Sequence, residues 1–261
     1  MSDRPSAIQA LAASPSESAL VLDFDGVLAP IVTDATASAM PEQTAASLSR
    51  LAPSLGVLAV ISGRPAEFLA DRVRLTGVRL LGSYGIEQIE DGDRRIDPAA
   101  QPWLDPVLEA TRVLDDRFRH AAGIRVEHKS VSVAVHWRQA PDHEAAAAQV
   151  TRAAAELAER TGLRLEPGKL VAELRPPIDV DKGSAIRTLL AEARPAVAAY
   201  AGDDLGDIPA LREVHDYGGY ALVVDHGDET DPRLRALADQ TFIGTDSFAA
   251  WLTSLAHKIS P

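Results

Sequence analysis

The chain has 261 residues, 46% of them hydrophobic, and a formal net charge of −12 at pH 7. This is enough for one large domain or two smaller ones, and the acidic balance disfavours nucleic acid and anionic membranes as partners, so we expect a small-molecule substrate. The chain contains no cysteine, which excludes disulfides, thiolate zinc sites and cysteine nucleophiles.

The amino-terminal segment carries charged residues and prolines where a signal peptide would have an apolar core. No stretch reaches the roughly 18 consecutive apolar residues that a membrane-spanning helix needs. A cytoplasmic location is therefore the default expectation, and the lack of cysteine suits a reducing compartment.

Short apolar runs alternate with helical patterns from residue 19 to about residue 85, and the same alternation returns after Asp181. Such alternation is typical of a parallel sheet flanked by helices, so we predict that both ends of the chain form one Rossmann-like α/β core. The predicted strands are 20–24, 57–61, 78–81, 196–201 and 220–224, and the predicted helices are 41–51, 65–73, 182–193, 205–213 and 245–257.

The middle of the chain has a different order, in which a helix and a hairpin occur twice. The predicted helices are 103–120 and 142–160, and the predicted strands are 124–128, 131–137, 163–166 and 169–174. Adjacent hairpins make an antiparallel sheet with helices over one face. We therefore predict an inserted α+β domain at 101–176, between core segments 1–100 and 177–261.

Two carboxylates, Asp23 and Asp25, follow the first buried strand. Ligands of parallel sheets gather outside the carboxyl ends of the strands, and the strand period of two points both side chains to the same side if the extended geometry persists. One carboxylate is then placed to attack a substrate and the other to move a proton. Pairs with the same spacing also occur in a predicted hairpin turn at 91–93 and before a helix at 179–181, so a solvated strand end is the alternative.

The second strand ends in Ser62, Gly63 and Arg64, directly before a helix that opens at Pro65. A hydroxyl and backbone N–H groups at this place can hold phosphate oxygens, so we predict a catalytic role for Ser62 and substrate binding by Gly63 and Arg64. The alternatives are a helix cap for Ser62 and a solvated surface charge for Arg64.

Lys182 stands in the first turn of a predicted helix, where the helix dipole is already positive. A lysine at this position favours an anionic partner, such as a phosphoryl group. The alternative is a solvent-facing lysine without a role.

Three further carboxylates, Asp203, Asp204 and Asp207, lie within five positions after the strand 196–201. Like charges packed at a strand end repel one another unless a cation neutralises them, which predicts a bound metal. Oxygen ligands, the lack of cysteine and the lack of an HExxH motif favour Mg²⁺ over zinc. A solvated acidic loop is the alternative.

Together, these residues predict a mechanism of covalent phosphoryl transfer. Asp23 would attack the phosphoryl group to form an aspartyl-phosphate, and Asp25 would protonate the leaving alcohol and later activate water. A carboxylate that approaches an anionic oxygen to about 3 Å is repelled by about 5 kcal/mol at an effective dielectric near 20, which Mg²⁺ and Lys182 would offset. Ser62 would also hold phosphoryl oxygens. The predicted metal ligands are Asp23, the carbonyl of Asp25 and Asp203, with Asp204 and Asp207 supporting them from outside the coordination sphere.

The motifs DFDG at 23–26, ISGR with Ser62, DKGSA with Lys182 and GDDLGD at 202–207 resemble, in this order, those of the haloacid dehalogenase superfamily of phosphatases. The insertion between the serine and lysine motifs resembles the type-two cap of the sugar-phosphate branch. Within that branch, segments 126–138 and 167–176 are similar to those of trehalose-6-phosphate phosphatases.

This resemblance implies a magnesium-dependent phosphatase that acts on trehalose 6-phosphate, with glucose recognition by Glu127, Lys129 and Glu173. Strand alternation independently gives the insertion a polar face, which includes His136 and Arg138 and suits sugar hydroxyls. We therefore predict that both bind substrate. A solvated sheet face, with a structural role for His136, is the alternative.

The chain departs from the usual family pattern at Val27 and Tyr84, where threonine and histidine are usual, and at Gly206 and Ile208, where threonine and glutamate are common. None of these changes removes a group that the chemistry needs. Hydrolysis of another sugar phosphate or a trehalose-like analogue, a mutase or phosphotransferase, and a catalytically silent sensor are the alternatives. Asp25 argues against the sensor, because a sensor needs no proton shuttle.

Overall fold

A computed structural model describes residues 4–32 and 35–260. Its contacts divide the chain into two compact units, which we call the core unit and the inserted unit. The core unit is made by the chain up to Arg95 and from Val180 onward, and the inserted unit is Ile96–Asp179. The sequence-based domain boundaries at 101 and 176 fall inside the inserted unit.

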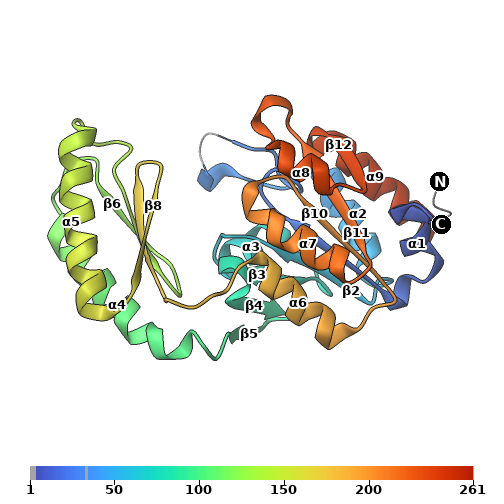
Figure 1. The fold of residues 1–261 in the computed structure, drawn as a ribbon, viewed down its shortest axis with the longest axis horizontal. Helices are drawn as coiled ribbons and strands as arrows, with labels where there is room; N and C mark the ends of the chain where they lie inside the picture. Colours follow the sequence, from blue (N-terminus) through green and yellow to red (C-terminus); the bar gives the residue numbers. More distant parts are fainter. Residues whose placement is uncertain (1–3, 33–34, 261) are drawn as a thin grey trace. The chain divides into compact units, whose positions relative to one another are not determined.

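The core unit contains an eight-stranded sheet with the order β12-β11-β10-β1-β2-β3-β4-β5 (Figure 1). Every pair from β12 to β3 is parallel, and β4 joins the edge antiparallel to β3. The mostly parallel sheet confirms the predicted α/β class. Its strands are β1 (Ser18–Asp23), β2 (Val57–Ile61), β3 (Arg79–Gly82), β4 (Glu87–Glu90), β5 (Asp93–Ile96), β10 (Val197–Gly202), β11 (Tyr220–Asp225) and β12 (Gln240–Ile243).

Helices cover both faces of this sheet, and the strand residues alternate between them. In β1, Leu20 and Leu22 belong to one buried cluster and Ala19 and Val21 to the other, so the strand is apolar throughout. The first face packs against α1 (Ala7–Ala13), α2 (Glu42–Leu51), α3 (Ala66–Val73) and α9 (Gly244–Ile259), and the second against α6 (Lys182–Ala193), α7 (Ile208–Asp216) and α8 (Pro232–Leu237). The short 3₁₀ helices of this unit are η1 (Pro15–Glu17), η2 (Ala35–Ala37), η3 (Ser83–Gly85), η5 (Leu205–Asp207) and η6 (Gly227–Glu229).

The predicted core elements are present. Within the described residues, α1, α8 and β12 were missed, and of β4 and β5 only the hairpin turn between them, at 91–93, was predicted. In β12 only Phe242 is buried and Ile243 is 74% exposed, so this strand lacks the apolar run that identifies its neighbours. The helices α1 and α8 have seven and six residues, too few for a clear helical period.

The inserted unit has a four-stranded antiparallel sheet with the order β6-β7-β9-β8. Its chain order is helix, hairpin, helix, hairpin, which confirms the two predicted α-β-β units. The apolar side of the sheet, with Val133, Val135 and Trp137, packs with apolar residues of both helices. The elements are η4 (Gln101–Trp103), α4 (Leu104–Phe118), β6 (Arg125–His128), β7 (Val133–His136), α5 (His143–Thr161), β8 (Arg164–Gly168) and β9 (Val171–Arg175).

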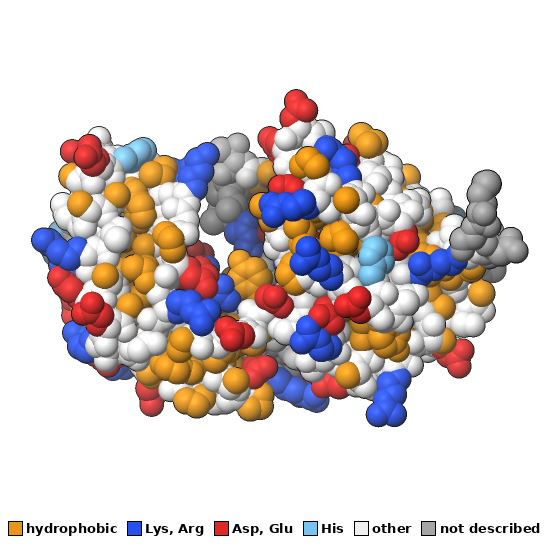
Figure 2. Space-filling model, viewed as in Figure 1, with side chains coloured by type: hydrophobic (Ala, Val, Ile, Leu, Met, Phe, Trp, Pro, Cys, Tyr) orange, Lys and Arg blue, Asp and Glu red, His pale blue; other side chains and the backbone are white. Residues whose placement is uncertain are grey.

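The surface mixes acidic and basic side chains. On the face shown in Figure 2, Lys and Arg are interspersed with Asp and Glu, so this side offers no continuous basic path for a nucleic-acid backbone. In the part of the chain that the structure describes, no helix is both long and apolar enough to cross a bilayer.

Candidate active site

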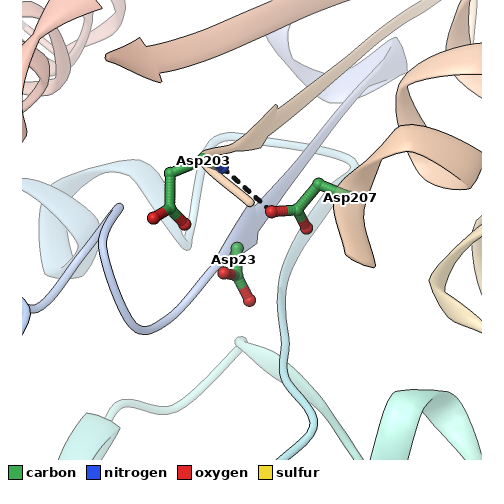
Figure 3. A group of neighbouring side chains, drawn as sticks. All are labelled: Asp23, Asp203 and Asp207. Carbon is green, nitrogen blue, oxygen red and sulfur yellow. Dashed lines mark hydrogen bonds between the residues drawn. The ribbon is translucent and has the colours of Figure 1, made fainter. Parts of the chain in front are cut away.

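Three buried carboxylates gather at the carboxyl ends of β1 and β10. Asp23 is the last residue of β1, Asp203 follows β10, and Asp207 lies in η5. The two strands are parallel neighbours, so their ends meet at one edge of the sheet. One carboxylate oxygen from each residue lies within 4.8 Å of the others (Figure 3). We call these three residues the carboxylate cluster.

Lys182 is buried against this cluster. Its Nζ lies 2.8 Å from Oδ1 of Asp23 and 2.7 Å from Oδ1 of Asp207. Burial alone would lower the pKa of Lys182, but the charges of Asp207 and Asp23 raise it well above its usual value. The solvent-facing alternative for Lys182 is therefore wrong. One ammonium group faces three carboxyl groups, so it cannot by itself neutralise all three in their ionised form.

Asp207 accepts four hydrogen bonds. The donors are Lys182, the hydroxyl of Tyr200 at 2.5 Å, and the backbone N–H groups of Asp203 at 2.9 Å and Asp204 at 3.0 Å. Although burial acts to raise its pKa, the Lys182 charge and these hydrogen bonds hold it below the usual value. Four bonds occupy the lone-pair directions of a carboxylate. Asp207 therefore fixes the loop that carries Asp203, as Figure 3 shows.

Asp203 has a different environment, because its Oδ1 is buried and has no hydrogen-bond partner among the described residues. Burial, with the charges of Asp207 and Asp204, raises the pKa of Asp203 to about 8. An unpartnered buried carboxylate oxygen beside other carboxylates is a position that a hard cation fits. Asp203 and Asp23 are therefore the side chains best suited to hold a metal cation. Asp204 is exposed, and its Oδ1 accepts the N–H of Gly206 at 2.8 Å.

Gly26 lets Asp203 approach the chain after β1. A Cβ at Gly26 would lie 2.1 Å from Oδ2 of Asp203, and its φ of +81° is one that side chains rarely adopt. The carbonyl of Gly26 also lies 2.9 Å from Nε2 of His226, which lies 3.5 Å from Oδ2 of Asp203. His226 was missed in the sequence, although it directly follows the carboxyl end of β11.

The pKa of Asp23 lies well above its usual value, because burial and the charges of Asp207 and Asp203 outweigh the effect of Lys182. A nucleophilic carboxylate must be ionised. Additional positive charge beside Asp23 would favour that ionised form. The electrostatics of this residue therefore also fit a divalent cation at the cluster.

Ser62 lies beside Asp23, because Ile61 of β2 is the parallel register partner of Asp23. Its side chain is buried, and its Oγ accepts the N–H of Arg64 at 3.1 Å. The helix-cap alternative is not supported, because the N-cap of α3 is Pro65. A Cβ at Gly63 would lie 2.8 Å from both Cζ and the hydroxyl oxygen of Tyr84, so the Tyr84 ring covers Gly63.

Asp25 does not belong to the carboxylate cluster. The extended geometry ends at Asp23, since the N–H groups of Leu28 and Ala29 both bond to the carbonyl of Phe24. The strand period of two therefore does not predict the direction of the Asp25 side chain. Its Oδ2 lies 2.9 Å from Nε of Arg64. The solvated-charge alternative for Arg64 is wrong, and the structure places its guanidinium on Asp25.

The residues predicted to recognise sugar belong to the inserted unit, where Glu127 and Glu173 each accept hydrogen bonds on one face of the sheet. Glu127 bonds to His136 at 2.6 Å, and Glu173 accepts bonds from Lys129 at 2.9 Å and Ser132 at 2.6 Å. Both glutamates are opposite Ala134 in the register, so they lie in one row across the sheet.

The hydrogen bond from His136 lowers the pKa of Glu127 to about 2 against the opposing effect of burial, so this glutamate is ionised at neutral pH. The side chains of Glu127 and His136 are 34% and 31% exposed, which leaves this face accessible to a ligand. Arg138 is exposed just beyond the end of β7.

The comparisons with known proteins agree over most of the chain. The family model "Trehalose-phosphatase" matches residues 21–237. The trehalose-phosphate phosphatase of Mycobacterium marinum is 38% identical over 249 residues, which cover 91% of this chain and 62% of that protein. The chain therefore spans less than two thirds of the length of this relative.

Solved structures show the same fold. A trehalose-6-phosphate phosphatase related protein matches with a TM-score of 0.75 and 22% identity, covering 92% of this chain and 97% of that one. The C-terminal domain of the Candida albicans trehalose-6-phosphate phosphatase matches with a TM-score of 0.67 and 22% identity, covering 96% and 95%. With the family model matching most of its length and a relative above one third identity, the chain belongs to the trehalose-phosphatase family of the haloacid dehalogenase superfamily.

Proposed function

We propose that this protein is a magnesium-dependent phosphatase that hydrolyses trehalose 6-phosphate to trehalose and phosphate. The observation that carries the proposal is the buried contact of Asp23 with Lys182 at 2.8 Å, beside the unpartnered oxygen of Asp203. The proposed nucleophile, a buried cation and an oxygen suited to a metal ion thus lie together at the end of β1. The name of the family and of its relatives supports the choice of substrate.

In the proposed reaction, Asp23 attacks phosphorus and forms an aspartyl-phosphate as the trehalose oxygen leaves. Lys182 and Ser62 hold the phosphoryl oxygens in line for this attack. Asp25 gives its proton to the leaving oxygen and then takes a proton from the water that attacks the intermediate. Bound to Asp23 and Asp203, Mg²⁺ would supply the charge that offsets repulsion between the carboxylate and the phosphoryl group.

Recognition of the sugar is assigned to the polar face of the inserted unit. Glu127 and Glu173 accept hydrogen bonds, and Lys129 donates them, which suits the hydroxyl groups of glucose. The preformed contacts within this face fix the side chains before substrate binds, which reduces the entropy lost on binding.

Phosphate release from a panel of phosphorylated sugars tests the proposal. We expect turnover of trehalose 6-phosphate with Mg²⁺, none with EDTA, and slower turnover of sucrose, mannosylglycerate and glucose phosphates. A faster rate on another sugar phosphate would move the assignment to that sugar. Binding without turnover would instead identify a sensor, and transfer of the phosphoryl group to a sugar hydroxyl would identify a phosphotransferase or mutase.

Glu127→Ala tests the role of the inserted unit. We expect kcat/KM for trehalose 6-phosphate to fall about 100-fold, because a hydrogen bond to a charged group contributes about 1.5–3 kcal/mol. The value for an aryl phosphate, which has no sugar, should change by less than about twofold. The control is Glu156→Ala, which removes an exposed glutamate that pairs with Arg117. An equal loss of kcat/KM on both substrates would show that Glu127 does not recognise the sugar.

A further inference from the structure

The carboxylate of Asp25 is held by side chains from two separate segments. Nε and Nη2 of Arg64 lie 2.9 Å and 3.3 Å from Oδ2 and Oδ1, and Oγ of Ser38 donates to Oδ1 at 2.7 Å. We call Arg64 and Ser38 the Asp25 clamp. Ser38 is fully buried, whereas the Asp25 side chain remains 34% exposed. The clamp therefore fixes this carboxylate without closing it off from solvent.

Arg64 is itself held by an aromatic ring. Phe68 and Arg72 are four residues apart and therefore lie on one side of α3, while Arg64 directly precedes Pro65, the N-cap of this helix. The guanidinium carbons of the two arginines lie 4.8 Å and 4.9 Å from the centre of the Phe68 ring. Phe68 also meets the ring of Phe24, the neighbour of Asp25 in the chain, edge to face at 6.0 Å.

Arg72 fixes the second half of the clamp. Its Nε donates to the carbonyl of Ser38 at 3.0 Å, and its Nη2 donates to the carbonyl of Thr36 at 2.8 Å. These bonds hold the segment that carries the Ser38 hydroxyl. Phe68 and Arg72, on one side of α3, therefore support both members of the Asp25 clamp, Arg72 through the backbone of the segment that carries Ser38.

We propose that Arg64 and Ser38 are positioning residues for proton transfer by Asp25, supported by Arg72, and that Arg64 does not bind the phosphoryl group. This inference rests on the proposed function. An ionised carboxylate has about four lone-pair directions, and the clamp occupies three of them. The remaining direction carries the proton that Asp25 gives to the leaving oxygen, and after that transfer it is free to take a proton from the attacking water. Proton transfer depends on such alignment, and a misplacement of about 1 Å can cost about 100-fold in rate.

Two phosphate esters separate positioning from phosphate binding. The trehalose leaving group is an alcohol that needs a proton, whereas nitrophenolate leaves from p-nitrophenyl phosphate without one. The parameter kcat/KM reports the steps up to formation of the aspartyl-phosphate. In these steps only the sugar ester needs Asp25 as an acid. Both esters need Asp25 as a base in the later hydrolysis of the intermediate.

For Arg64→Lys, Ser38→Ala and Arg72→Met, we expect kcat/KM on trehalose 6-phosphate to fall at least about tenfold and kcat/KM on p-nitrophenyl phosphate to stay within about twofold. The variants should also release a rapid first burst of nitrophenolate, because hydrolysis of the intermediate becomes slow. The affinity for inorganic phosphate should not change. Arg74→Met, at the exposed end of the same helix, is the matched control and should behave as wild type.

An Asp25→Asn background provides a second test, because adding Ser38→Ala there should cost nothing further on either ester. If Arg64→Lys lowers kcat/KM equally on the two esters and weakens phosphate binding, Arg64 binds phosphate. That result would overturn this inference but not the proposed function. A wild-type protein that hydrolyses neither ester would overturn the proposed function, and the inference with it.

Discussion

Asp23→Asn is expected to abolish phosphate release, with kcat at least about 10³-fold below wild type, while the protein stays folded. The amide has nearly the same shape as the carboxylate but cannot attack phosphorus. Stability should be retained because burial and the neighbouring carboxylates already raise the pKa of Asp23, so a neutral side chain is tolerated at this position. Steady-state kinetics and thermal unfolding of the variant measure the two effects.

The control for this variant is Asp216→Asn, which makes the same chemical change at an exposed position at the end of α7. It should leave both kcat and the melting temperature unchanged. Activity near the wild-type level in Asp23→Asn would show that Asp23 is not the nucleophile, whatever the effect on stability.

Lys182→Met is expected to lower the free energy of unfolding by about 3 kcal/mol or more at pH 7 in EDTA, and to abolish activity. Lys182 is buried and is the ammonium group that contacts both Asp23 and Asp207. Methionine has a similar volume but no charge, so it leaves these carboxylates buried without their cation. Urea unfolding measures the loss, and Lys258→Met, at an exposed position in the last turn of α9, is the control.

The destabilisation by Lys182→Met should become smaller as the pH falls from 7 to 5. The pKa of Lys182 is raised above 10.5, so the lysine stays charged throughout this range. In the wild type the charge of Lys182 holds the pKa of Asp207 below its usual value against the effect of burial. Without Lys182, burial should raise the pKa of Asp207 above its value in the unfolded chain, so protonation then favours the folded state of the variant. A loss that is the same at both pH values, or below about 1 kcal/mol, would show that Lys182 does not neutralise the cluster.

The core sheet was predictable because its central strands are buried on both faces. In β1 the residues from Ser18 to Asp23 are all buried, which gives an apolar run ending in a carboxylate. The same logic located Ser62 and Asp203, since each follows the carboxyl end of a neighbouring parallel strand. His226 satisfies this criterion as well and was overlooked.

The contacts of Asp25 were not predictable from local patterns. Its direction depends on the turn at Gly26, and that glycine is required by the close approach of Asp203, which is distant in sequence. Its partner Arg64 is 39 positions away, and Ser38 lies in a segment without a regular pattern. The acidic motif 203–207 predicted a cluster, but the hydroxyl of Tyr200, from an apolar strand, helps to determine how Asp207 is held.

Detection of a phosphorylated Asp23 tests the central claim most directly. Asp25→Asn should form the aspartyl-phosphate from p-nitrophenyl phosphate and hydrolyse it slowly, because the base for the second step is missing. After mixing with Mg²⁺ and this ester and quenching in acid, mass spectrometry should find one added phosphoryl group on the peptide that contains Asp23, and none in the Asp23→Asn protein. Two results would contradict the account, provided that the wild-type enzyme hydrolyses the ester. In the first, no phosphoryl group appears on Asp23 of the Asp25→Asn protein. In the second, the phosphoryl group appears on another residue of that protein.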